Sequence, residues 1–162
     1  MKPEFDRLGD PYASCAEEGL RALRRPHRAR VAPADPRRLT GSVNLEACLA
    51  RVAAFEGHAT WDYGVGFLAP DGSTRCAVWI EVHNATPGDV RSMVAKLQTL
   101  RRWLDSDGRP LAAPTDAARR TLGRTPFRWI AVGPTSVPAS SRAFRAAAEA
   151  GLGAPERRLD IP

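Results

Sequence analysis

The stretch that decides the fold is Thr60–His83, with the sequence TWDYGVGFLAPDGSTRCAVWIEVH. It contains two apolar runs, Trp61–Leu68 and Cys76–Val82, on either side of the segment APDGS at Ala69–Ser73. Proline, aspartate and glycine between two such runs are typical of a tight turn. The stretch therefore predicts a β-hairpin.

The register of this hairpin follows from centring its turn on Pro70–Ser73. One apolar face is then formed by the pairs Tyr63–Ile80, Val65–Val78 and Phe67–Cys76, and the other face contains the pair Gly64–Trp79. Asp62 and Glu81 also oppose each other, and Cβ atoms of opposed residues lie about 4.5–5.5 Å apart. A slip by one residue would turn the apolar set to the wrong face. The pattern therefore favours a register that joins two carboxylates, with His83 on the same face, as in a divalent-metal site.

A helix is predicted before the hairpin, over the segment SVNLEACLARVAAF at residues 42–55. Ser42 can cap this helix, and its apolar residues recur with helical spacing. Glu46 lies in the first turn. It is either a third carboxylate for the site or an acid that complements the helix dipole.

A second helix is predicted after the hairpin, over DVRSMVAKLQTLRRWL at residues 89–104. Thr86 is a natural N-cap and Pro87 suits the first helical position. Apolar residues recur at spacings of three and four, and we expect this stripe to pack on the apolar face of the hairpin. Lys96 lies outside the stripe, so it is either a solvated lysine or a charge for the site.

The remaining elements complete a mixed α/β domain over residues 41–162, with helices on a small mixed sheet. We expect a short helix at 116–122, a strand at 127–133, a helix from Ser140 or Ser141 to residue 150, and an edge strand at 157–161. Residues 1–40 are rich in arginine and proline and show no sustained period. They are expected to form an extended or poorly ordered basic arm.

The charge distribution suggests an anionic partner. The formal net charge is +6, and both ends of the chain are basic while the centre is acidic. This suits a metal site within a surface that binds DNA or RNA phosphates. A solvated arginine-rich surface is the alternative. The four tryptophans could stack on bases, although their spacing favours packing.

The cysteines and the hydropathy give further expectations. Cys15, Cys48 and Cys76 are scattered without a CxxC pair, which argues against a zinc finger and a disulfide framework. No run of about 18 apolar residues predicts a membrane span, and the first residues lack the apolar segment of a signal peptide. Cytoplasmic residence is the default expectation.

The order of these motifs resembles the restriction-endonuclease-like, or PD-(D/E)XK, superfamily. Its pattern is an acid on a helix, an Asp at a strand start, Glu-x-Lys on the next strand, then a helix and a strand. Glu46, Asp62 and Glu81-Val82-His83 occupy the corresponding positions. The resemblance implies that Asp62 and Glu81, with the Val82 carbonyl, hold Mg²⁺ or Mn²⁺ and that water attacks a phosphodiester.

Two departures from the family pattern leave two functions open. His83 replaces the lysine and could act as a base or a ligand, while Lys96 could supply the missing charge. The superfamily also places a further strand before the Asp strand, where this chain is predicted to be helical. The first hypothesis is a metal-dependent nuclease-like domain with Asp62, Glu81, His83 and Lys96 as catalytic residues. The second is a catalytically degenerate domain that binds protein or nucleic acid.

Overall fold

The computed structural model describes residues 5–134, 138 and 140–162. Its strands are β1 (Ala16–Glu17), β2 (Val31–Pro33), β3 (Leu39–Asn44), β4 (Tyr63–Leu68), β5 (Arg75–His83), β6 (Phe127–Ala131) and β7 (Leu159–Ile161). Its α-helices are α1 (Arg25–Arg28), α2 (Leu45–Leu49), α3 (Val90–Asp105), α4 (Ala112–Leu122) and α5 (Arg142–Glu149). Short 3-10 turns are η1 (Phe5–Leu8), η2 (Ala13–Cys15), η3 (Pro36–Arg38), η4 (Ala53–Phe55), η5 (Pro87–Asp89) and η6 (Arg109–Leu111).

The hairpin β4–β5 forms in the predicted register. Tyr63 pairs with Ile80, Gly64 with Trp79, Val65 with Val78 and Phe67 with Cys76. At the turn, Asp71 Oδ1 accepts hydrogen bonds from the backbone N–H groups of Ser73 and Thr74, both at 2.8 Å. Gly72 adopts a φ of 73°, which glycine tolerates best. Local turn chemistry and hydrophobic alternation therefore agree.

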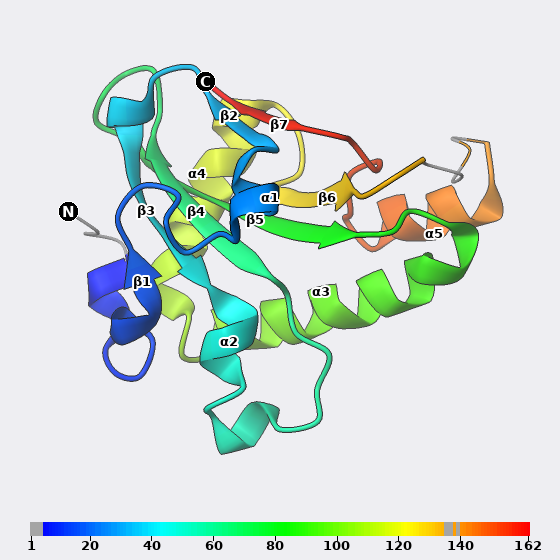
Figure 1. The fold of residues 1–162 in the computed structure, drawn as a ribbon, viewed down its shortest axis with the longest axis horizontal. Coiled ribbons are helices and arrows are strands. Elements are labelled where there is room, and N and C mark those ends of the chain that lie inside the picture. Colours follow the sequence, from blue (N-terminus) through cyan, green and yellow to red (C-terminus); the bar gives the residue numbers. More distant parts are fainter. Residues whose placement is uncertain (1–4, 135–137, 139) are drawn as a thin grey trace.

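The hairpin forms the centre of a five-stranded mixed sheet with the order β1-β3-β4-β5-β6. All neighbours are antiparallel except β5 and β6, which are parallel. A separate pair of parallel strands, β2 and β7, lies at the top of Figure 1, where segments from the two ends of the chain meet. The architecture is therefore mixed α/β, with helices flanking a mixed sheet.

Both faces of the sheet are buried, and each carries its own hydrophobic core. The side chains of α3 pack with Trp79 and Trp129 in one core, while those of α4 pack with Val78 and Ile80 in the other. All four tryptophans are fully buried, which confirms the packing interpretation. Figure 1 shows α3 and α5 running along one side of the sheet.

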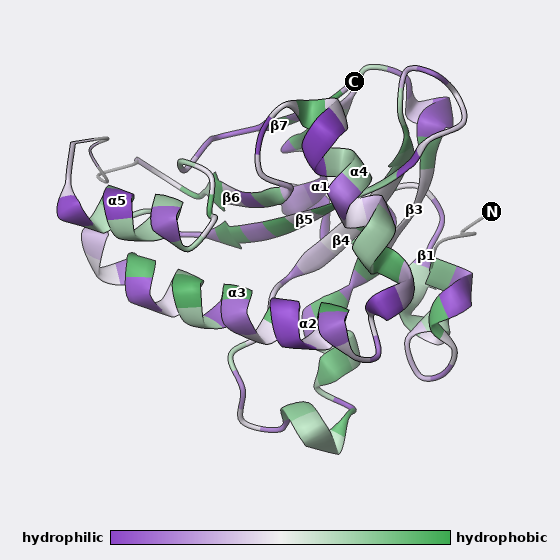
Figure 2. Ribbon diagram, turned by 180° about the vertical axis from the view of Figure 1, so that it is seen from behind, coloured by the Kyte–Doolittle hydropathy of each residue, from purple (hydrophilic) through white to green (hydrophobic). Residues whose placement is uncertain are grey.

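The position of α3 corrects the expectation that its stripe covers the face of Tyr63, Val65 and Phe67. It covers the opposite face, because Trp79 fills the space above Gly64 and makes that face apolar too. A Cβ at Gly64 would lie only 2.6 Å from Cζ3 of Trp79. The helix itself is as predicted, with the Thr86–Asp89 capping box at its start. Figure 2 shows its alternation of hydrophobic and hydrophilic turns.

The segment at residues 42–55 differs from the predicted long helix. Residues up to Asn44 belong to β3, and only Leu45–Leu49 form α2, followed by the turn η4. Asn44, rather than Ser42, caps the helix by accepting a 2.9 Å hydrogen bond from the Ala47 N–H. Ser42 is instead buried in the sheet, where its hydroxyl accepts from the Ala22 N–H. The pairing of β3 with β4 overrides the local helical pattern.

The described part of the N-terminal segment, residues 5–40, is packed on the domain, contrary to the expected extended or poorly ordered arm. Phe5 and Tyr12 are buried in the same core as the apolar residues of α3, and β1 pairs with β3. The Tyr12 ring meets Trp103 edge-on, and its hydroxyl donates a 2.6 Å hydrogen bond to Asp107. Arginine and proline dominate the composition, but a few well-placed apolar residues anchor the segment.

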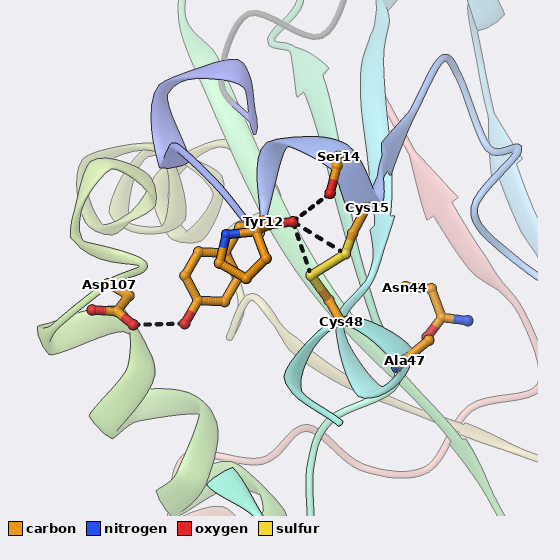
Figure 3. Close-up of a disulfide and its surroundings, with 8 residues drawn as sticks. Tyr12, Ser14, Cys15, Asn44, Ala47, Cys48 and Asp107 are labelled. Carbon is orange, nitrogen blue, oxygen red and sulfur yellow. Dashed lines mark hydrogen bonds between the residues drawn. A yellow bond between two sulfur atoms is a disulfide. The ribbon is translucent and has the colours of Figure 1, made fainter. Parts of the chain in front are cut away.

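A disulfide between Cys15 and Cys48 joins this segment to α2, which corrects the expectation of unpaired cysteines (Figure 3). Their Cα atoms lie 5.8 Å apart across 33 residues of sequence. The spacing of the cysteines carries no signal for this bond, because it depends on η2 docking against α2. Cys76 lies outside this disulfide and is a buried core residue, as expected.

The C-terminal elements follow the prediction closely. α5 begins after Ser141, whose hydroxyl accepts a hydrogen bond from the Phe144 N–H at 3.1 Å. β6 and β7 lie within the predicted strands, and α4 starts four residues earlier than expected. The expected start of the helix at Ser140 or Ser141 is therefore resolved in favour of Ser141.

Candidate functional site

The two acids of the hairpin meet at its open end, as the register predicts. Asp62 directly precedes β4, and Glu81 lies within β5 on the face covered by α3. The Asp62 backbone N–H donates to Glu81 Oε2 at 2.9 Å, and the Val82 N–H donates to Asp62 Oδ2 at 3.0 Å. Each carboxylate is thus held by the backbone beside the other.

Lys96 completes the cluster from α3. Its ammonium donates to Glu81 Oε1 and forms an ion pair with that carboxylate. The side chain of Lys96 is 16% exposed, whereas that of Glu81 is fully buried. The interpretation of Lys96 as a solvated lysine is therefore wrong. It is placed beside the acids because α3 covers their face of the sheet.

The surroundings of Asp62 and Glu81 raise the pKa values of both carboxyl groups. Burial, and then the neighbouring charge of Asp62, raise the pKa of Glu81 to about 8, more than Lys96 lowers it. Burial also raises the pKa of Asp62, against the opposing effects of the Val82 N–H and Lys96. The attraction of Glu81 helps to raise the pKa of Lys96 although burial opposes it. Burial therefore shifts both carboxyl groups towards their protonated forms.

Glu46 lies near the acids but outside their hydrogen-bonded cluster. The first turn of α2 rests on Asp62, whose backbone oxygen accepts from the Leu45 N–H at 2.8 Å and the Glu46 N–H at 3.4 Å. The charge of Glu46 contributes to the raised pKa of Asp62. The Glu46 side chain lines a cavity of about 300 Å³ together with Thr60, which Asp62, Glu81 and Lys96 do not line.

His83 is directed to a different partner from the one that sequence reasoning expected. Its Nδ1 lies 3.6 Å from Asp89 Oδ1 at the start of α3 and 3.2 Å from the Asn84 backbone oxygen. It shares the sheet face of Glu81, but the capping turn before α3 occupies it. His83 and the acids therefore do not form one ligand set in this structure.

His27 is a neighbour of the site that sequence reasoning missed. Its Nδ1 lies 2.9 Å from the Tyr63 hydroxyl, and its charge acts to lower the pKa of Asp62. The signal is absent from the sequence, because α1 reaches β4 only through the folding of the N-terminal segment over the sheet.

The geometry limits how a metal could be held. Within the described residues, no group of three or more His, Cys, Asp and Glu side chains is arranged to hold a metal ion. The expected set of Glu46, Asp62 and Glu81 is thus not assembled, and only the last two are in contact. Any cation here would have two protein carboxylates at most and would keep several waters.

Comparisons with known proteins add no family. No protein-family model, curated protein or solved structure matches this chain. In the part of the chain that the structure describes, no helix is long and apolar enough to cross a membrane. The function of the chain is therefore inferred from the site itself.

Proposed function

We propose that this chain is a metal-dependent nuclease-like domain that acts on nucleic-acid phosphodiesters. The observation that carries the proposal is the convergence of Asp62, Glu81 and Lys96. They come from the residue before β4, the last part of β5 and the following helix α3. Two carboxylates and a lysine are the groups that the PD-(D/E)XK pattern requires.

The order of elements around the cluster supports a restriction-endonuclease-like fold. The hairpin β4–β5 leads into α3, and β6 returns parallel to β5. β3 pairs with β4 and supplies the additional strand that the superfamily places before its Asp strand. The sequence had offered no such strand, so this similarity arises independently of the motif.

The donor atoms fit a hard divalent cation. Asp62 Oδ1 accepts no hydrogen bond among the described residues, and Mg²⁺ is commonly bound through one or two carboxylates with several waters retained. Asp62 and Glu81 would hold the ion, with Glu46 close enough to add negative charge. When bound, the ion would polarise the phosphate and activate water.

Lys96 takes the part that the family pattern assigns to the lysine of Glu-x-Lys. Its ammonium lies against Glu81 and supplies a fixed positive charge, which a neutral His83 does not. Such a charge stabilises the negative charge that builds on a phosphoryl group during displacement. In this proposal Asp62 and Glu81 hold the cation, Lys96 stabilises charge, and His83 positions the start of α3 through Asp89.

The arginine-rich ends are the proposed contact with DNA or RNA. Arg24, Arg25 and Arg28 lie on or beside α1, whose His27 contacts Tyr63 next to Asp62. Arg24 and Arg25 are exposed. Cations beside an acidic site attract a phosphate backbone without reading its sequence.

The burial of the acids favours a second candidate, a catalytically degenerate domain that binds protein or nucleic acid. Glu81 is 0% exposed and Asp62 is 8% exposed. Both oxygens of Glu81 already accept hydrogen bonds, one from Asp62 and one from Lys96. A cluster of this kind can serve as a buried polar link between the hairpin and α3.

Metal titration separates the two candidates. We would titrate Mn²⁺ and Mg²⁺ by calorimetry into the wild type, Asp62→Asn, and Asp160→Asn as a control at an exposed carboxylate. The nuclease proposal expects the wild type and the control to bind metal and Asp62→Asn to lose this binding. It likewise expects metal-dependent cleavage of DNA or RNA by the wild type and the control, and loss of cleavage in Asp62→Asn. Because removing one carboxylate relieves repulsion, Asp62→Asn should remain folded.

Two results would decide against the nuclease. One is the absence of metal binding by the wild type, both alone and with a non-hydrolysable phosphorothioate oligonucleotide. The other is cleavage that Asp62→Asn leaves unchanged. The first result, combined with retained oligonucleotide binding, would instead establish the degenerate nucleic-acid-binding domain.

A further inference from the structure

The disulfide between Cys15 and Cys48 has one buried end and one accessible end. Cys48 is 0% exposed within the core, whereas Cys15 is half-buried. Cys15 lines a cavity of about 320 Å³ between the N-terminal segment and α2, together with Ser14, Asn44 and Ala47. A small molecule that enters this cavity therefore meets Cys15, whereas Cys48 is enclosed by the core.

Charged residues around the cavity give it a cationic bias. Arg21, Arg51 and Glu17 line it, so its own charged side chains are two cations and one anion. Arg21 is also 3.6 Å from Glu18, but this is an exposed pair. Arg51 has no acidic partner within 4.0 Å among the described residues. Anionic molecules are thus favoured over cationic ones.

A backbone oxygen beside the two sulfurs can accept hydrogen bonds from the cysteine thiols that form when the disulfide is reduced. The Pro11 backbone oxygen lies beside both sulfurs, 3.5 Å from Cys15 Sγ and 3.7 Å from Cys48 Sγ. The same oxygen accepts a 2.7 Å hydrogen bond from the Ser14 hydroxyl. Neither sulfur carries a proton in the disulfide. After reduction, either S–H group could donate to this oxygen without a change in the backbone.

We propose that the Cys15–Cys48 disulfide is a thiol-exchange site at which a small anionic thiol attacks Cys15. The proposal rests on the half-buried Cys15, the cavity that it lines and the excess of arginine along the cavity wall. It is independent of the metal site and of the nuclease proposal. The class of ligand is a low-molecular-weight thiol that carries a carboxylate or sulfonate group.

The exchange proceeds in two balanced steps. The thiolate attacks Cys15 Sγ, a new sulfur–sulfur bond forms there, and the bond to Cys48 breaks. Cys48 Sγ leaves with the electron pair and takes up a proton from water. A second thiolate then attacks the sulfur of the first thiol, which yields the external disulfide and a Cys15 thiolate. Two thiols are oxidised and the protein disulfide is reduced.

The disulfide is connected to the acidic cluster through the short helix α2. Cys48 belongs to α2, and the first turn of α2 donates two hydrogen bonds to the Asp62 backbone oxygen. Breaking the bond releases α2 from η2 but leaves the packing of Phe5 and Tyr12 in place. Exchange therefore breaks one covalent link, while Phe5 and Tyr12 still anchor the N-terminal segment in the core.

The first experiment locates the adduct in the oxidised wild-type protein. When the oxidised chain is unfolded without reduction, one cysteine, Cys76, is expected to react with a thiol reagent. Brief treatment with mercaptoacetate, quenching and peptide mass spectrometry should find the mixed disulfide on Cys15. Three free thiols before treatment, or an adduct mainly on Cys48, would overturn the proposal.

The second experiment tests the charge preference. For mercaptoacetate, the rate of reduction of the protein disulfide is divided by the rate at which the same thiol reduces a neutral small disulfide. The same ratio is measured for the cationic thiol cysteamine. At low salt, we expect this ratio to be about three- to tenfold higher for mercaptoacetate than for cysteamine. The estimate assumes that the charge on the thiol lies roughly 7 Å from the net charge of the cavity wall, in water. High salt should remove most of this difference. An equal ratio for both thiols would overturn the proposal.

Variants assign the preference to the cavity wall. Arg51→Gln should remove most of the three- to tenfold advantage of mercaptoacetate, since the charged side chains that line the cavity would then be one cation and one anion. Arg120→Gln, on α4 at the opposite face of the sheet, is the matched control and should leave the advantage unchanged. The same loss in both variants would mean that overall charge, rather than this cavity, sets the rate, and would refute the assignment.

Discussion

At the scale of single residues, Glu81 is the clearest case of a side chain whose chemistry is set by its surroundings. It is fully buried, faces Asp62 and touches Lys96. Burial and the neighbouring carboxylate raise its pKa to about 8 from the ordinary value of 4.5. The folded protein therefore holds a proton across a pH range in which the unfolded chain has lost it.

The sign of this shift predicts how stability depends on pH. The contribution of Glu81 is fully present below about pH 4.5 and is lost as the pH rises towards 8, at up to roughly 1.4 kcal/mol per pH unit. Urea unfolding between pH 5 and pH 8 should show a shallower fall for Glu81→Gln than for the wild type. Asp62, whose pKa is also raised, contributes a fall of the same sign in both proteins.

An exposed acid provides the control for this measurement. Glu56→Gln on the turn after α2 should leave the wild-type slope intact. If Glu81→Gln shows the full wild-type slope as well, Glu81 does not hold the proton, and the electrostatic description of the cluster is wrong.

At the scale of elements, α3 connects the hydrophobic core to the site. Its stripe packs with Trp79 and Trp129, and this placement turns Lys96 towards Glu81. Leu97 lies in the middle of the helix and is 1% exposed. The packing of the apolar face of α3 on the sheet therefore also fixes the position of Lys96 beside Glu81.

Leu97→Ala is expected to cost about 2–5 kcal/mol of unfolding free energy, because it leaves a cavity in a closely packed core. Urea unfolding measures this cost. Gln98→Ala, the exposed neighbour on the same helix, should change stability by less than about 0.5 kcal/mol. A near-neutral Leu97→Ala would show that α3 does not pack on the sheet in this way.

At the scale of the whole molecule, the N-terminal segment is an integral part of the domain. β1 extends the main sheet and β2 pairs with β7, so segments near both ends of the chain are tied into the fold. The Cys15–Cys48 bond adds a covalent link across 33 residues. Stability should therefore depend on the redox state.

Removing this link has a calculable effect in the chain-entropy model. Closing a loop of this length stabilises a fold by about 3–4 kcal/mol. The double variant Cys15→Ser/Cys48→Ser should lose roughly that amount in urea unfolding without reductant. The reduced wild type serves as the reference and should match the variant. If reductant leaves the wild-type stability unchanged, the bond is absent in solution.

The sequence by itself determined the hairpin, its register, the capped α3 and the later strands, because these depend on turn residues, caps and periodicity within short segments. It could thus predict that Asp62 and Glu81 meet. The strand β3 and the short α2 could not be predicted, since pairing with β4 overrides the helical pattern there.

Only the tertiary structure decided which face of the sheet α3 covers, and with it the partner of Lys96. The sequence suggested one apolar and one polar face, but β5 is central and buried on both sides, so alternation along the hairpin does not show where each helix lies. The Cys15–Cys48 bond and the contact of His27 with Tyr63 join residues far apart in the chain. Their spacing carries no signal, because the docking of the N-terminal segment alone brings them together.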